Sequence, residues 1–135
     1  MHTLTFSVLR NYGHSWSGIE VPVTLRVDHH RSVDLLAKVD TGAEFCIFQR
    51  EYADMLELPF EAGEHKRFAT ATGAFDTRGH SVTLSSFDFE FESVVFFATE
   101  VNFPRNVLGR QGWLDRLRVG LVHHDQRLYL SKYDD

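Results

Sequence analysis

One carboxylate on a tight turn is the clearest candidate for chemistry in this chain. Asp40 begins the tetrapeptide Asp-Thr-Gly-Ala, and the apolar-rich residues 33–39 directly before it predict a strand. Hydrolysis of a peptide bond by carboxylates needs two of them that share a proton. Like charges a few ångströms apart cannot both ionise, so the pair supplies acid and base together. The turn at Asp40 provides half of such a pair.

No equivalent turn elsewhere in the sequence provides the second carboxylate. The Asp-Thr pair at Asp76 is followed by Arg78 instead of Gly, and the Thr-Gly pair that ends at Gly73 is preceded by Ala. A carboxylate pair would therefore require two copies of the chain. We expect a symmetric homodimer in which two Asp40 turns meet on the two-fold axis.

A second motif, in which two apolar residues precede Gly and Arg, follows about 70 residues after the turn. Its residues are Val107, Leu108, Gly109 and Arg110. The Asp-Thr-Gly-Ala turn, a glycine-containing segment and this motif follow one another in the order seen in the retropepsin-like aspartic proteases. Over roughly residues 20–131 the chain resembles that family, in particular its bacterial single-domain members.

The resemblance implies a role for each residue of the turn. Asp40 would be the catalytic carboxylate, and the hydroxyl of Thr41 would reach the partner chain's turn. Gly42 would let a backbone amide approach the carboxylate closely, and Ala43 would let the substrate backbone pass. Gly109 of the second motif would pack behind the turn, where a Cβ would collide. The alternative is an ordinary surface turn, which Asp and Gly also favour.

Glu44 and Arg110 allow two interpretations. They could form a partly buried ion pair that joins the turn to the second motif, and breaking such a pair costs several kcal/mol. They could equally be two exposed charges whose interaction contributes less than about 1 kcal/mol.

Residues 68–79 contain small side chains and predict a mobile hairpin that the resemblance identifies as a flap over the substrate. Many relatives have several glycines at the flap tip, whereas this tip has Gly73 alone. Phe68 and Phe75 could line a substrate pocket or could serve packing. The candidate substrate-binding or flap residues are Glu44, Thr72, Gly73 and Ala74.

The remaining segments are mostly of strand character. Pro59 ends a predicted helix over residues 50–58, and residues 111–117 predict a helical turn. Turn residues lie at 11–13 and 15–18. Strands are expected at residues 3–9, 19–27, 33–39, 44–48, 80–84, 87–98, 107–108, 119–122 and 127–130. We therefore expect one domain over residues 1–135, with an all-β, retropepsin-like fold forming a closed or partly open β-barrel with one or two short helices.

Composition argues against several classes of partner. The net charge is −5 and no Lys/Arg cluster exceeds two residues, which argues against nucleic acid. No apolar run approaches the roughly 18 residues of a membrane span. Cys46 is the single cysteine, and residues 1–20 lack the apolar core of a signal peptide. We expect a soluble protein in the reducing cytoplasm.

Three functions remain open. The first is an aspartic endopeptidase that cleaves extended, apolar segments of protein, without metal or other cofactor. The second is a non-catalytic peptide-binding or dimerisation module with the same fold. The third is a metal-dependent hydrolase built on His29-His30 and His123-His124, although no His-Glu-x-x-His or Cys-x-x-Cys pattern is present.

Overall fold

The computed structural model describes residues 1–14 and 18–135, and it is built mostly of β-strands. Most of the turn expected at residues 15–18 lies outside the described residues. Within the described chain one α-helix is present, α1 (Arg50–Met55), together with three short 3-10 turns. This confirms the expectation of a mainly β fold with few helical residues. No helix in the described part is both long and apolar enough to cross a membrane.

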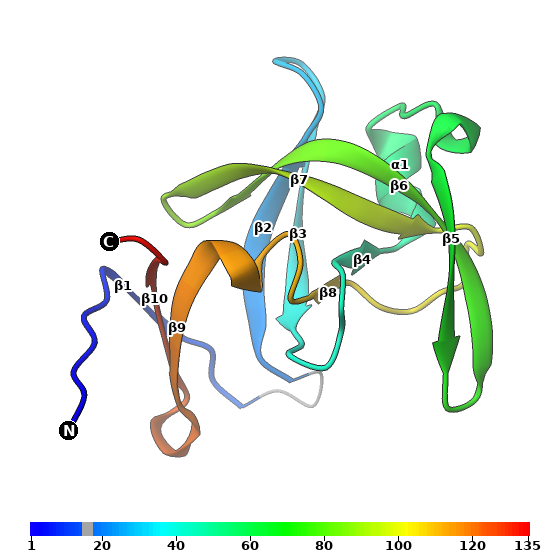
Figure 1. Cartoon of the computed structure of the whole chain (residues 1–135). Helices are drawn as coiled ribbons and strands as arrows, with labels where there is room; N and C mark the ends of the chain where they lie inside the picture. The colour runs from blue at the N-terminus through cyan, green and yellow to red at the C-terminus, as the bar shows by residue number, and fades with distance from the viewer. Residues whose placement is uncertain (15–17) are drawn as a thin grey trace.

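A seven-stranded sheet forms the body of the molecule (Figure 1). Its strands, in spatial order, are β2 (Glu20–Arg26), β3 (Ser32–Val39), β8 (Val107–Leu108), β4 (Ile47–Phe48), β7 (Phe89–Ala98), β6 (Gly73–Ser86) and β5 (Glu64–Thr70). β2 also pairs with β6, so the sheet returns on itself. The result is a partly closed barrel with short, irregular strands at β4 and β8.

Pro22 in β2 fits this closure. Its strand pairs with β3 along its whole length but with β6 only at residues 24–26. The nitrogen of Pro22 therefore lies at a position where β6 accepts no hydrogen bond from β2. Proline has no N–H, so it is tolerated at such a position in a strand.

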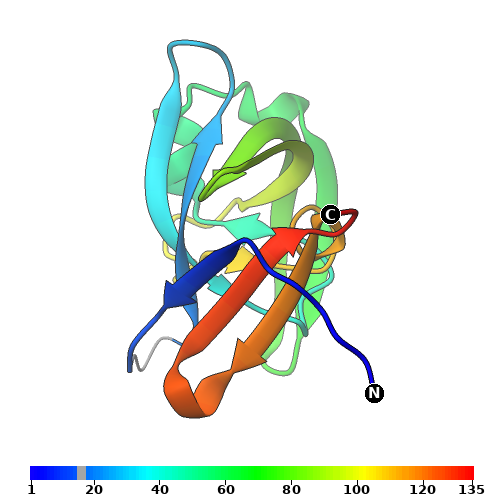
Figure 2. The same ribbon diagram turned by 90° about the vertical axis from the view of Figure 1, so that its left-hand side faces the viewer.

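A second sheet of three strands contains the first and the last strand of the chain, as Figure 2 shows. β1 (Val8–Asn11) and β9 (Leu117–Val122) lie on either side of β10 (Arg127–Lys132). The strand expected at residues 3–9 is thus displaced toward the C-terminus. Its partner is β10, with Val8 opposite Leu130. The β9–β10 hairpin is present as expected, around the 3-10 turn η3 (His123–Asp125).

Both predicted helical segments are present at the expected positions, but each is shorter than expected. α1 ends at Met55 instead of Leu58, because Glu57 adopts a positive φ of 54° before Pro59. A short 3-10 turn, η1 (Phe60–Ala62), follows it. The turn expected at residues 111–117 is a single 3-10 turn, η2 (Leu114–Arg116). The strand expected over 44–48 is reduced to β4, with Phe45 in an isolated bridge.

The hydrophobic core has two parts. The larger cluster joins the barrel to the three-stranded sheet and includes the fully buried Phe48, Phe97 and Trp113. A smaller cluster has Ile47, Phe96 and Val107 at its centre, and partly buried aromatic side chains pack on it: Phe45, Phe68, Phe75 and Phe103. Complete burial of such a side chain stabilises the fold by roughly 1.5–3 kcal/mol. The smaller cluster joins the short strands to the β5–β6 hairpin.

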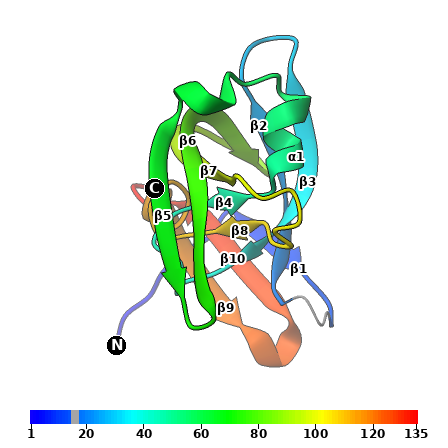
Figure 3. The ribbon, with the colours of Figure 1, turned by 90° about the vertical axis from the view of Figure 1, so that its right-hand side faces the viewer.

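The expected hairpin is present as β5 and β6, which turn at Ala71 and Thr72. Phe68 and Phe75 are cross-strand partners, and their rings stack with centroids 5.6 Å apart. The tip residues 69–74 are exposed. Figure 3 shows the hairpin extending away from the body of the sheet, beside β4 and β8.

Candidate active site

Asp40 directly follows β3 and is held in a turn by three hydrogen bonds. Its own N–H donates to the carbonyl of Leu108 at 3.0 Å, and the N–H of Ala43 donates to the Asp40 carbonyl at 3.2 Å. The N–H of Gly42 donates to Asp40 Oδ1 at 2.9 Å. The last bond fixes the carboxylate on its own turn, as expected for Gly42. Within the described part of the chain, Oδ2 has no hydrogen-bond partner.

The second motif is packed directly against this turn. β8 pairs in parallel with the end of β3, Val39 lying opposite Leu108. A Cβ placed on Gly109 would lie 2.6 Å from the carbonyl carbon of Phe45 and 2.8 Å from the carbonyl oxygen of Ala43. Real Cβ atoms essentially never approach backbone so closely. Gly109 therefore stands where a side chain would displace the backbone of the turn, as the resemblance implied.

Arg110 connects to the turn through backbone atoms. Its N–H donates to the carbonyl of Ala43 at 2.9 Å, and its guanidinium donates to the carbonyl of Thr41 at 2.8 Å. Glu44 is exposed, and its carboxylate accepts a long bond of 3.4 Å from the side chain of Gln111. Between Glu44 and Arg110 no ion pair forms in the described chain. The exposed-charge interpretation therefore holds for Glu44, while Arg110 stabilises the turn.

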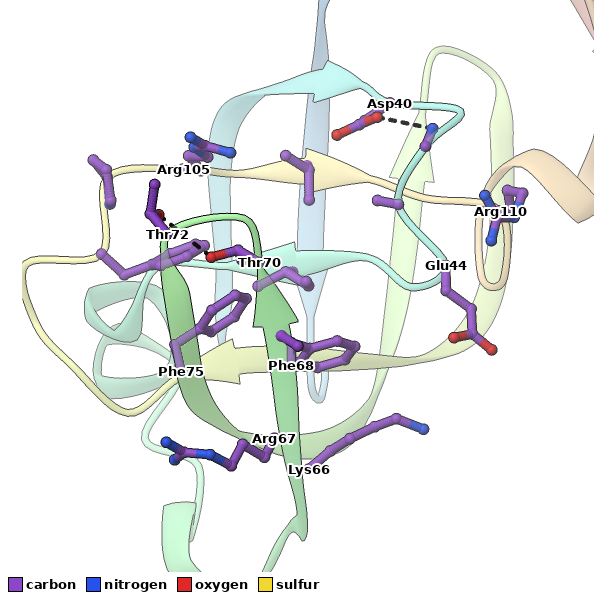
Figure 4. Close-up of a pocket in the computed structure, with 17 residues that line it drawn as sticks. Asp40, Glu44, Lys66, Arg67, Phe68, Thr70, Thr72, Phe75, Arg105 and Arg110 are labelled. Carbon is purple, nitrogen blue, oxygen red and sulfur yellow. Dashed lines mark hydrogen bonds between the residues drawn. The ribbon is translucent and has the colours of Figure 1, made fainter.

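A cleft of about 710 Å³ opens in front of Asp40 (Figure 4). The turn forms one wall, the β5–β6 hairpin forms the opposite one, and the loop before β8 forms an end. Its polar and charged lining residues are Asp40, Glu44, Lys66, Arg67, Thr70, Thr72, Arg105 and Arg110, and its other lining residues are Gly42, Ala43, Ile47, Phe68, Ala69, Phe75, Phe103, Pro104 and Val107.

The structure brings most of the predicted site residues to this cleft. Glu44 and Thr72 line it, whereas Gly73 and Ala74 lie in the hairpin tip but are not part of the lining. Phe68 and Phe75 line the cleft and also pack on the smaller core cluster, so both interpretations of these residues apply. Thr41 is exposed on the turn.

Six lining residues were not identified from the sequence: Ile47, Lys66, Arg67, Phe103, Pro104 and Arg105. The sequence signal that could have found the last three was their position just before the second motif. One of the cations is already paired. Arg67 forms an ion pair with Asp76 across the hairpin at 3.0 Å. The hydrogen bonds from Arg67 and His65 lower the pKa of Asp76, so this carboxylate stays ionised.

The other candidate chemical groups lie outside the cleft lining. His29 and His30 are in the β2–β3 turn, and His123 contacts the hydroxyl of Tyr12 at 2.6 Å. Among residues 1–14 and 18–135, no three His, Cys, Asp or Glu side chains are grouped as a metal site would require. Cys46 is fully buried, and burial raises the pKa of its thiol to about 12.

Comparison with known proteins agrees with this geometry. Residues 21–114 match the sequence profile of a family described as aspartyl protease. No curated protein sequence matches the chain. Among solved structures, the retroviral EIAV protease in complex with the inhibitor HBY-793 superposes with a TM-score of 0.52. It shares 18% sequence identity, and the match covers 67% of this chain and 80% of the EIAV protease chain. At this identity the likeness shows a shared retropepsin-like fold.

Proposed function

Since the chain belongs to the aspartyl protease family, we propose that it is an aspartic endopeptidase whose active site forms between two copies of the chain. The observation that carries the proposal is the position of Asp40. Its carboxylate is fixed by Gly42 at the wall of a cleft of about 710 Å³ that faces a projecting hairpin. A concave site that combines apolar surface with a fixed polar group is typical of substrate binding.

The proposed chemistry uses one proton shared by Asp40 and the same residue of a second copy. The ionised carboxylate takes a proton from a water molecule, which attacks the carbonyl carbon of the peptide bond. The protonated carboxyl then donates to the leaving nitrogen. In each chain Oδ1 accepts the Gly42 N–H, so Oδ2 is the oxygen available for the water and for the shared proton.

The cleft supports binding of an extended peptide. The β5–β6 hairpin and the Asp40 turn form two facing walls, and a peptide between them could pair with backbone groups as an added strand. Ile47, Phe68, Phe75 and Val107 provide apolar contact surface within the lining. This favours substrates with apolar side chains at the bond that is cleaved.

The decisive experiment compares Asp40→Asn with Asp34→Asn in cleavage of an unfolded protein such as reduced casein. Asp34 lies six positions earlier, on the exposed side of β3, where it accepts a hydrogen bond from Thr24. We expect Asp40→Asn to abolish cleavage with an unchanged circular dichroism spectrum, and Asp34→Asn to retain it. Full activity in Asp40→Asn would end the proposal.

Native mass in solution separates this proposal from the non-catalytic module. A dimer has about twice the 15.6 kDa mass of one chain. Light scattering across a dilution series should detect that mass at every protein concentration at which cleavage is observed. A chain that stays monomeric at every concentration has one Asp40 and no carboxylate pair, which would favour a peptide-binding role without turnover.

A further inference from the structure

The net charge of the cleft lining is opposite in sign to the net charge of the whole chain. The protein has a net charge of −5. The cleft lining nevertheless contains four cationic side chains, Lys66, Arg67, Arg105 and Arg110, against the two carboxylates of Asp40 and Glu44. A concave surface with an excess of one sign of charge attracts ligands of the other sign.

Three of these four cations have no carboxylate partner in the described part of the chain. Among the described residues, Arg67 is the one of the four that forms an ion pair, with Asp76. The ammonium of Lys66 lies 4.2 Å from the centre of the Phe45 ring, and the guanidinium of Arg110 is bound to a backbone carbonyl. Arg105 is exposed, and no hydrogen bond or ion pair holds it among residues 1–14 and 18–135. Its five donors are available to a ligand.

Two of these cations, Arg105 and Arg110, lie on opposite sides of the proposed catalytic carboxylate (Figure 4). Figure 4 shows Arg105 beside Thr72 of the hairpin tip, on one side of Asp40, and Arg110 near Glu44 on the other side. A peptide that crosses the cleft past Asp40 would bring side chains from both sides of the cleaved bond near a cation. Successive side chains of an extended peptide point to opposite faces, so only some positions can make this contact.

We propose that the cleft selects peptides with acidic side chains flanking an apolar centre, and that Arg105 is the main residue that recognises them. This inference rests on the proposed function and adds its substrate class. A guanidinium binds a carboxylate through two parallel hydrogen bonds, which gives geometric selectivity as well as attraction. The apolar lining residues then contact the centre of the peptide, and the cations contact its flanks.

The test uses two synthetic octapeptide pools that differ only in having Glu or Gln on both sides of a central Phe-Leu pair. Cleavage rates are measured with the wild-type protein. Affinities are measured by fluorescence anisotropy of labelled pools with the Asp40→Asn protein. That substitution itself removes a negative charge from the cleft. The effect of Arg105→Gln on affinity is therefore measured in the Asp40→Asn protein, with Asp40→Asn alone as the reference. Arg26→Gln is the matched control, since Arg26 pairs with Ser32 at the opposite end of β3 from Asp40.

We expect the Glu pool to bind and to be cleaved about two- to tenfold better than the Gln pool. Raising the salt concentration should reduce this ratio, because the ion pairs are partly exposed. Arg105→Gln should bring the binding ratio close to one, and Arg26→Gln should leave it unchanged. Equal binding of the two pools, binding of neither, or an unchanged ratio in Arg105→Gln would contradict the inference.

The two proposals can fail separately. If the wild-type protein cleaves neither pool nor casein, the protease function is refuted, while the affinity ratio still decides whether the cleft selects acidic peptides. If the protein cleaves both pools equally, the protease function stands and the acidic preference is refuted.

Discussion

Replacing Gly109 by Ala tests whether the second motif positions the proposed catalytic turn at Asp40. A Cβ at this position would lie 2.6 Å from the Phe45 carbonyl carbon, and ordinary van der Waals contact begins at 3.4 Å. The carbonyl oxygen of Phe45 would lie closer still, so the backbone of the turn or of the motif has to move by at least about 0.8 Å. The two segments are held together by hydrogen bonds from the backbone N–H groups of Arg110 and Gln111 to the carbonyls of Ala43 and Glu44. Movement of one side chain therefore cannot relieve the strain.

The expected effect is large for a single methyl group. Overpacking of this kind costs about 1–3 kcal/mol, which for a domain of this size lowers the melting temperature by roughly 4–12 °C. A displacement near 1 Å in a catalytic group can cost on the order of 100-fold in rate. The rate of peptide cleavage is measured below the melting temperature of Gly109→Ala, where the variant is folded. We expect this rate to fall by more than the loss of folded protein would explain.

Gly120→Ala provides the matched control. Its Cβ would lie 2.8 Å from an atom, but that atom is the far end of the Phe6 side chain. Phe6 can rotate away, and Gly120 lies in β9, in the sheet that contains the termini. Gly120→Ala should therefore lose less than about 1 kcal/mol and retain cleavage. A Gly109→Ala protein with the melting temperature and activity of Gly120→Ala would refute the argument that Gly109 supports the turn.

Two further predictions concern titratable groups. The pKa of Asp28 is lowered from 3.8 to about 2, first by the hydrogen bond from the His30 N–H and then by the side chain of Arg31. The ionised carboxylate therefore stabilises the folded chain, and this stabilisation is lost as the pH falls from about 4 to 2. The difference in melting temperature between wild type and Asp28→Asn should be constant above about pH 5 and disappear as the pH falls toward 2; a constant difference down to pH 2 would contradict this. The buried Cys46 thiol should resist iodoacetamide in the native protein and react after unfolding in urea, as measured by mass spectrometry; rapid native alkylation would show that the segment opens.

The parts of the fold that could be predicted from the sequence are those that local residues determine. The apolar run before Asp40 gives a strand, Pro59 follows the end of the helix, and Val107-Leu108 forms the expected short strand. The Asp-Thr-Gly-Ala turn is local as well, because Gly42 bonds to a side chain two positions before it.

Features that depend on distant contacts were missed. The N-terminal strand begins later than expected, because its alternation of apolar and polar residues fits several registers. Its position is fixed by distant contacts, such as the hydrogen bond from the Ser7 N–H to the Ser131 hydroxyl, 124 positions apart. The cationic lining of the cleft was missed for the same reason. Lys66 lies on β5 and Arg105 lies in the loop before β8, so only the folded chain brings them together.

The terminal sheet also constrains how two Asp40 turns can meet. Both edges of β10 are occupied, by β1 on one side and β9 on the other, within one chain. A second chain could add a strand only at the outer edge of β1 or β9 unless β1 is displaced. The Asp40 turn needs no such exchange, because its own hydrogen bonds hold it and Thr41 and Gly42 are exposed. A catalytic pair formed in this way would join two already folded chains, so its population would depend on protein concentration while the fold of each chain would not.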